Sequence, residues 1–272
     1  MADKRTERKK LTTKTLITMK KNGEKIACLT AYDFLMARYL EEAGIDVVLV
    51  GDSLGNVVQG NPTTITVTLD EMIYHAKIVK KSIRNALLVV DLPFMSYHVD
   101  LKEAVRNCGR VMKETGCDAV KLEGGERIAE VVKHLVKVGI PVMGHLGLTP
   151  QSINIFGTYV TRGTDPKEAK QIQKDAKILE EAGCFAVVLE KIPAELAKKV
   201  TTSIKIPTIG IGAGINCDGQ ILVTHDMLGM TEMFRPRFVR RYMDLATEAK
   251  DAFRKYIKDV KDKKFPGKGE SY

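Results

Sequence analysis

The sequence contains no tryptophan, and aromatic residues make up only 6% of its 272 residues. Proteins that bind single-stranded nucleic acid commonly stack bases on aromatic side chains, so this composition offers little for that function. Cysteine is scarce as well: the five cysteines are odd in number, widely spaced and without a Cys-x-x-Cys pair. This pattern argues against a disulfide framework or a zinc site and favours reduced thiols.

Long apolar runs are also missing. No uninterrupted apolar stretch reaches the roughly 20 residues that a membrane-spanning helix requires. The N-terminus is basic but lacks the apolar core of a secretory signal. Together with the thiol pattern, these absences lead us to expect a cytoplasmic protein.

The central part of the chain lacks an excess of either charge, although the formal net charge is +9. Residues 1–14 carry six Lys/Arg and two Asp/Glu, and residues 250–272 carry eight and four. The residues between them hold 29 basic and 28 acidic side chains. We therefore predict a basic flexible leader at 1–12 and a basic C-terminal tail at 261–272, both solvated, with a nucleic-acid-binding module as an alternative.

What the sequence does contain is a regular alternation of short buried strands and helices. A helix at Thr13–Lys21 precedes the first strand, and the last helix is predicted at Pro236–Val260. Apolar and β-branched runs indicate eight strands. They are Ile26–Thr30, Ile45–Val50, Ala86–Leu92, Ala119–Leu122, Pro141–Met143, Phe185–Leu189, Ile206–Ile211 and Gln220–Val223.

This alternation, with no composition break that would mark a linker, favours a parallel sheet. Eight such units in a chain of this length fit a closed (β/α)8 TIM barrel better than an open sheet. We predict one α/β barrel domain over residues 13–260, with an extra N-terminal helix that plugs or flanks it. The active site of such a barrel lies at the C-terminal ends of its strands.

Four of the predicted strands run directly into an acidic residue at that end: Asp52, Asp91, Glu123 and Glu190. The first three follow consecutive strands, so their carboxylates are expected to converge, and converging like charges repel unless a cation joins them. Oxygen ligands without a His or Cys companion favour Mg²⁺. The competing interpretation is that each acid only caps the next helix.

Two further residues beside these acids are candidate substrate ligands. Lys121 lies two residues before Glu123 and therefore faces the same side of the strand. A lysine in a buried strand needs a partner, which makes Lys121 a candidate ligand for a substrate carboxylate or oxyanion, or else a charge that reaches the rim. Ser53, beside Asp52, can donate to a bound carboxylate, although a plain turn serine explains it equally well.

Glu190 lies across the predicted barrel from the three other acids. A carboxylate separated from the metal cluster can serve as a general base that approaches the substrate from the other side. His145 and His225 lie at strand ends, and whether they line the pocket or play a structural role stays open.

Six blocks of the sequence resemble the ketopantoate hydroxymethyltransferase family. They are TAYD at 30–33, VGDSLG at 50–55, DLPFM at 91–95, KLEGG at 121–125, GHLGLTPQS at 144–152 and IGIGAG at 209–214. The resemblance covers roughly residues 13–256, and several blocks are long enough to be specific. The charged ends and Lys191 depart from the family pattern.

The resemblance implies transfer of a hydroxymethyl group from 5,10-methylenetetrahydrofolate to 3-methyl-2-oxobutanoate through a Mg²⁺-stabilised enolate, giving 2-dehydropantoate for coenzyme A synthesis. It places the family's metal positions on Asp52, Asp91 and Glu123. Its ketoacid contacts fall on Asp52, Ser53, Asp91 and Lys121, and its base on Glu190. The resemblance also implies a homodecamer.

The alternative within enzymes is a metal-dependent ketoacid carbon–carbon lyase or mutase of a related barrel family. Those relatives use a flexible loop with a Lys-Cys-Gly-His type of signature. In this sequence the corresponding long loop offers residues 147–154 instead, and the one Cys-Gly pair, Cys108-Gly109, falls within a predicted helix.

Overall fold

The structure, a computed structural model, describes residues 8–232 and 236–272. The chain divides into two compact units. The first, here called the barrel unit, ends at Leu222, and the second, the C-terminal unit, begins at Val223. Each unit is described by itself.

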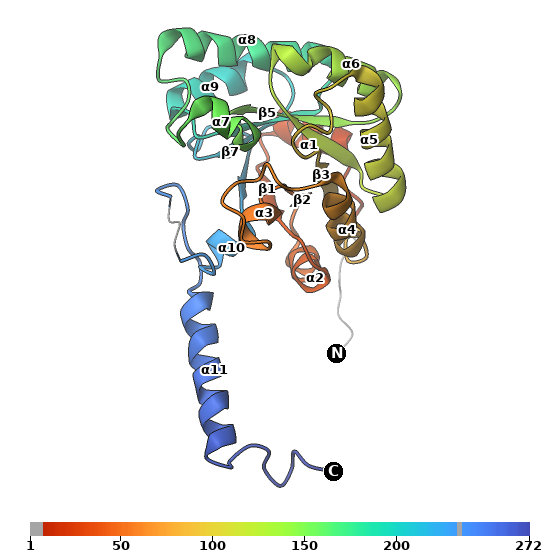
Figure 1. The fold of residues 1–272 in the computed structure, drawn as a ribbon. Helices are drawn as coiled ribbons and strands as arrows, with labels where there is room; N and C mark the ends of the chain where they lie inside the picture. The colour runs from red at the N-terminus through yellow and green to blue at the C-terminus, as the bar shows by residue number, and fades with distance from the viewer. Residues whose placement is uncertain (1–7, 233–235) are drawn as a thin grey trace. The chain divides into compact units, whose positions relative to one another are not determined.

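The barrel unit contains a closed barrel of eight parallel strands in sequence order, in which β8 pairs with β1. Helices lie around the strands (Figure 1). The strands are β1 Ile26–Thr30, β2 Val47–Val50, β3 Leu87–Asp91, β4 Ala119–Glu123, β5 Val142–Gly147, β6 Ala186–Glu190, β7 Thr208–Ile211 and β8 Gly219–Leu222. The predicted TIM barrel is therefore confirmed.

Helices precede the barrel and connect most of its strands. The longer ones are α1 Thr13–Asn22, α2 Phe34–Ala43, α4 Leu69–Lys80, α5 Leu101–Thr115, α6 Ala129–Lys137, α8 Pro166–Ala182 and α9 Ala194–Ser203. Shorter ones are α3 Leu54–Val57, η1 Glu126–Ile128, η2 Pro150–Ser152 and α7 Ile153–Phe156. Residues 212–218 join β7 to β8 without a helix.

Capping residues explain where several of these helices begin and end. Asp100 and Asp165 accept backbone N–H groups at the starts of α5 and α8, which satisfies donors that have no partner within the helix. Gly116 and Gly183 follow the same helices with positive φ angles, a conformation that costs glycine little. These local signals made the middle helices predictable to within a few residues.

Side chains alternate along each strand between two apolar layers. In β2, Val48 and Val50 point outward to the layer that packs against the helices. Val47 and Leu49 point inward to a smaller cluster that fills the barrel. The inward positions give way to polar side chains only at the C-terminal ends of the strands, which is where a site can form.

The N-terminal helix α1 plugs the barrel rather than flanking it. Leu16 is fully buried and belongs to the cluster that fills the barrel, together with Ile26 and Leu87. Lys20, near the end of α1, forms an ion pair with Asp218 at 3.0 Å. The helix therefore closes the end of the barrel where the strands begin.

Two basic side chains of the predicted leader make contacts within the barrel unit. Arg8 donates to the carbonyl of Ile45 at 2.8 Å and pairs with Asp46. Lys10 Nζ lies 2.6 Å from Asp118 and donates to Ala86 at 2.7 Å. These two charges are therefore partnered, whereas residues 1–7 of the predicted leader lie outside the described residues.

The predicted end of strand five, Met143, was wrong because β5 continues to Gly147. Glycine weakens a strand, which is why the prediction ended there. At Gly144 the strand packs so closely against α8 that a Cβ would lie 2.7 Å from Leu179 Cδ1. The longer strand turns the side chain of His145 into the barrel.

The C-terminal unit contains α10, Thr224–Met227, and α11, Leu245–Lys261. The predicted start of the last helix at Pro236 was wrong, because α11 begins at Leu245. The residues 236–244 that precede it are turns and irregular structure.

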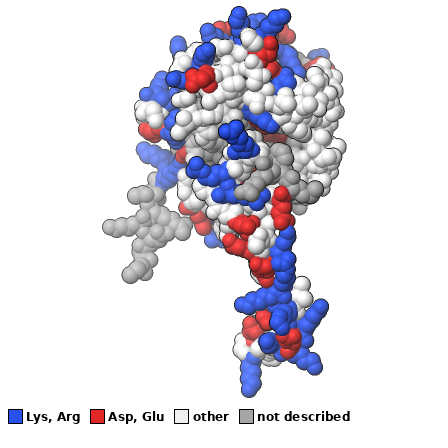
Figure 2. Space-filling view, turned by 90° about the vertical axis from the view of Figure 1, so that its left-hand side faces the viewer, with Lys and Arg blue, Asp and Glu red and all other residues white. Residues whose placement is uncertain are grey.

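No helix among the described residues is long and apolar enough to cross a membrane. Figure 2 shows acidic and basic side chains close together on the face that it presents. This mixture agrees with the near balance of charge in residues 15–249 and does not suggest a phosphate-binding surface.

We expect Leu16→Ala to lower the free energy of unfolding by about 2 to 5 kcal/mol, because it opens a cavity in a fully buried part of the barrel. Urea denaturation followed by circular dichroism measures this change. Lys14→Ala on the exposed side of the same helix is the matched control and should stay within about 0.5 kcal/mol of the wild type. Equal stability of the two variants would contradict the plug.

Candidate active site

Strand register brings the predicted site residues together at the C-terminal end of the barrel. Asp91, the last residue of β3, is aligned with Lys121 of β4. Glu123, the last residue of β4, is aligned with His145 of β5. Because parallel strands place aligned residues side by side, all four side chains enter the barrel at neighbouring positions. All four are buried.

Asp52 lies in the turn that follows β2 and is held against Asp91. The Asp52 backbone N–H donates to Asp91 Oδ2 at 3.1 Å, and Asp52 Oδ2 accepts from Gln151 Nε2 at 2.9 Å. Burial, together with the charges of Asp91 and Glu123, raises the pKa of Asp52 to about 8. The two aspartates are thus close enough to oppose each other's ionisation.

Lys121 is the positive charge among Asp52, Asp91 and Glu123, which are here called the acidic group. Its Nζ lies 2.7 Å from Asp91 Oδ1 and 4.0 Å from Glu123 Oε1. Although burial acts to lower the pKa of Lys121, these two carboxylates outweigh it and hold the pKa above its ordinary value. The prediction that Lys121 faces the same side as Glu123 is confirmed, and the lysine does not reach solvent.

Gln151 and Tyr97 fix the position of Glu123 from outside the strands. The Gln151 backbone N–H donates to Glu123 Oε2 at 3.0 Å, and the Tyr97 hydroxyl donates to Gln151 Oε1 at 2.8 Å. The Glu123 backbone N–H in turn donates to the Tyr97 hydroxyl at 3.1 Å. This network links the loops after β3 and β5 to the carboxylates.

His145 connects the acidic group to Glu190. Its Nδ1 lies 3.2 Å from Glu123 Oε1, and its Nε2 lies 3.3 Å from Glu190 Oε2. Burial and Lys121 act to lower the pKa of His145, but the contacts with Glu123 and Glu190 outweigh them and raise it to about 9. Glu190 ends β6 and is the most exposed of the four acids, with 16% of its side chain accessible.

Ser53 lies at the edge of this group. Its hydroxyl is 2.8 Å from the Tyr32 hydroxyl, and the residue is partly exposed. Since Ser53 follows Asp52 directly, it stands at the opening of the acidic group rather than inside it.

The donor set suits a small hard cation. Asp52, Asp91 and Glu123 supply only carboxylate oxygens, and burial together with the charges of the other two raises the pKa of Asp52. Among the described residues, no group of three or more His, Cys, Asp or Glu side chains is arranged to hold a metal ion as it stands. Mg²⁺ does not require a complete protein cage, because it usually takes one or two carboxylates and keeps several waters.

The sequence did not identify Gln151 as a site residue, and it left the role of His145 open. Gln151 belongs to η2, not to a strand, so no alternation pattern points to it. His145 would have been placed inside the barrel had the strand prediction extended past Gly144. His225 belongs to α10 in the C-terminal unit.

Comparisons with known proteins match the whole barrel and beyond. The family described as ketopantoate hydroxymethyltransferase matches residues 10–268. The chain is 59% identical to the 3-methyl-2-oxobutanoate hydroxymethyltransferase of Christiangramia forsetii over 266 residues, which cover 98% of both chains. It is 56% identical to the enzyme of Chlorobaculum tepidum over 96% of both chains.

Solved structures of distant proteins share the fold. A crystal structure of phosphonopyruvate hydrolase superposes with a TM-score of 0.63 at 11% identity, covering 96% of this chain and 93% of that one. A structure of 2,3-dimethylmalate lyase gives a TM-score of 0.59 at 16% identity, covering 95% and 87%. Identities this low show the barrel fold alone.

The full-length relatives therefore select the transferase over the related lyases and mutases, and over a nucleic-acid-binding module. The relatives act on 3-methyl-2-oxobutanoate, and the acidic group described above occupies the strand ends at which barrel enzymes place their chemistry. The chain belongs to the ketopantoate hydroxymethyltransferase family and is a hydroxymethyltransferase of pantothenate biosynthesis.

Proposed function

We propose that Asp52, Asp91 and Glu123 hold Mg²⁺ beside the ketoacid and that Glu190 is the catalytic base. The observation that carries this proposal is the division of the acids. Asp52, Asp91 and Glu123 lie near Lys121, whereas Glu190 comes from β6 and contacts His145. When bound, Mg²⁺ would stabilise the negative charge of the enolate that forms from the ketoacid.

The chain's own residues supply the remaining steps. Lys121 places a positive charge next to Asp91, where it can bind the ketoacid's oxygens and stabilise an anion. Ser53 can donate to the ketoacid at the opening. Glu190 then takes the proton from C3, and His145 Nε2 can donate to Glu190 to hold its carboxylate in place.

The proposed one-carbon donor is 5,10-methylenetetrahydrofolate, as the family resemblance implies. Overall, C3 of the ketoacid loses its proton and gains the methylene carbon, both bonds from that carbon to the folate nitrogens break, and water supplies the hydroxyl oxygen. The two remaining protons go to those nitrogens, and tetrahydrofolate leaves. Exchange of the C3 proton with solvent does not require the folate, so the two halves of the reaction can be measured separately.

Glu190→Gln should reduce exchange of the C3 proton of 3-methyl-2-oxobutanoate with deuterium by about 10² to 10⁴-fold, because it removes the base. Proton NMR in deuterium oxide with Mg²⁺ and without folate measures this rate. Ketoacid binding, measured by calorimetry, should stay within a few-fold of the wild type.

Glu195→Gln, on the exposed side of the following helix α9, is the matched control and should exchange at the wild-type rate. Full exchange in Glu190→Gln would remove Glu190 from this role. Loss of both exchange and ketoacid binding would place it among the binding residues instead.

The raised pKa of Asp52 predicts how Mg²⁺ binding depends on pH. Below pH 8 Asp52 holds a proton that a metal ion must displace, so affinity should rise with pH by up to about tenfold per unit and level off above pH 8. Calorimetry between pH 6 and pH 9, in two buffers of different ionisation enthalpy, measures both affinity and proton release. Affinity that is constant over this range would refute the assignment.

We also propose that the chain acts in the cytoplasm as a homodecamer. Apolar residues recur at helical spacing along α11, at Phe253, Tyr256, Ile257 and Val260, and none is buried. Such a stripe supports association between copies. Light scattering after size-exclusion chromatography should give a mass near ten times the 30.2 kDa of the chain, and a monomer mass would contradict this assembly.

A further inference from the structure

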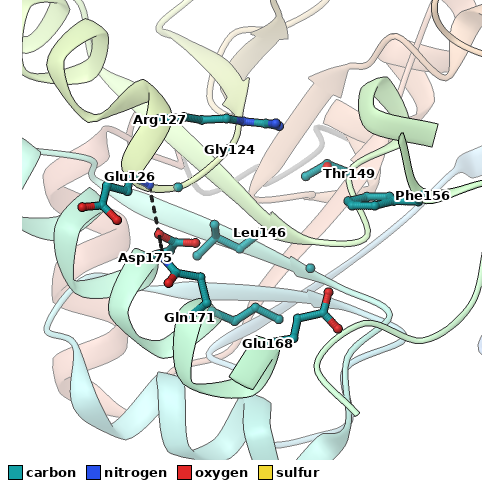
Figure 3. Close-up of a pocket in the computed structure, with 12 residues that line it drawn as sticks. Gly124, Glu126, Arg127, Leu146, Thr149, Phe156, Glu168, Gln171 and Asp175 are labelled. Atoms are coloured by element: carbon teal, nitrogen blue, oxygen red, sulfur yellow. Dashed lines mark hydrogen bonds between the residues drawn. The ribbon is translucent and has the colours of Figure 1, made fainter. Parts of the chain in front are cut away.

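A crevice opens beside the acidic group, where β4 and β5 end (Figure 3). Its volume is about 490 Å³, within the roughly 300 to 1,000 Å³ of small-molecule sites. One wall is the turn at residues 124–127, and the opposite wall is the face of α8 that carries Gln171 and Asp175. The side chain of Phe156 closes one end.

The crevice adjoins the proposed reaction centre without sharing a residue with it. Gly124, in one wall, directly follows Glu123 and donates its N–H to the carbonyl of His145 at 3.1 Å. Gly147, in the floor, is aligned with Glu190 of the neighbouring strand. A ligand in this crevice therefore contacts the residue that follows Glu123 and the strand that neighbours Glu190.

Asp175 offers the crevice a carboxylate that is already oriented. Its Oδ1 accepts from the Glu126 backbone N–H at 3.0 Å and from Gln171 Nε2 at 2.9 Å (Figure 3). Both of these hydrogen bonds reach Oδ1, which leaves Oδ2 available to a ligand. An ionised carboxylate oxygen has two lone pairs, so Oδ2 can accept from two neighbouring N–H donors on a planar group.

Apolar surface lies next to this carboxylate. Leu146 and Ile172 line the crevice, and the Phe156 ring is held by the Arg162 guanidinium, 4.0 Å from the ring centre. Flat apolar surface beside a few polar groups is typical of sites for planar heterocycles.

The charges of the crevice oppose a second ketoacid anion. Three carboxylates line it: Glu126 is paired with Lys174 at 2.8 Å and Glu168 with Arg162, which leaves the carboxylate of Asp175 to oppose an anion. A planar group that donates hydrogen bonds fits this environment better than an anion does.

We propose that this crevice binds the pterin of the reduced-folate donor, with Asp175 Oδ2 accepting from its 2-amino group and N3–H. The inference rests on the proposed function, because it takes the one-carbon donor to be a folate. It adds a location: the pterin lies outside the barrel between the β4 turn and α8, and the one-carbon unit reaches over the strand ends to the ketoacid.

Asp175→Asn tests the contact, because asparagine keeps an oxygen for the Glu126 N–H and replaces the other acceptor by a donor. The KM for methylenetetrahydrofolate should rise about tenfold or more. Deuterium exchange at C3, which needs no folate, should keep its wild-type rate. Glu181→Gln, which makes a comparable change on the exposed side of α8, is the control and should leave the KM unchanged.

An unchanged KM in Asp175→Asn would overturn the proposal, and so would a parallel loss of exchange, which would indicate a structural role. If wild-type protein itself shows no C3 exchange, the proposed function fails instead. A measurement on the wild-type chain is independent of folding of the variant: tetrahydrofolate should slow amide hydrogen exchange in residues 124–127 and 168–175. Protection confined to other segments would place the donor elsewhere.

Discussion

The structure depends on a balance of buried charge at the C-terminal end of the barrel. Three carboxylates, one ammonium and one imidazole are each removed from water, and none would be tolerated there alone. Lys121 offsets part of the negative charge of Asp91 and Glu123. The pKa of Asp52 stays raised because the residue is buried and because the charges of Asp91 and Glu123 add to the effect of burial.

The rest of the barrel serves to hold this group in place. Strand register sets Asp91 beside Lys121 and Glu123 beside His145, while the apolar cluster below them, closed by Leu16 of α1, excludes water from the other end. Gln151 adds contacts from outside the strands, to Asp52 through its side chain and to Glu123 through its backbone. The strands therefore set the positions of the acids, and the loops add hydrogen bonds to them, as in other barrels.

The proposed mechanism and the proposed pterin site use opposite sides of the same strand ends. The acidic group lies inside the barrel, where a small anion with a cation can be enclosed. The crevice lies outside β5, between the β4 turn and α8, where a larger planar molecule has room. Such a division would let the ketoacid be activated before the second substrate is joined to it.

The sequence alone predicted the eight strands, the barrel and the acids at the strand ends, because a side-chain period of two and the helix caps are local signals. It also predicted that Lys121 shares a face with Glu123, since that follows from strand geometry. It misplaced the start of α11 at Pro236. The helix begins after Asp244, whose side chain makes no capping hydrogen bond.

Only the tertiary structure decided the roles of His145 and Gln151. His145 faces inward because β5 continues through Gly144, and that continuation depends on close packing against Leu179 of α8. Gln151 reaches Asp52 across 99 positions of sequence. Contacts of this kind leave no local pattern, because they arise only when the closed barrel brings distant loops to one rim.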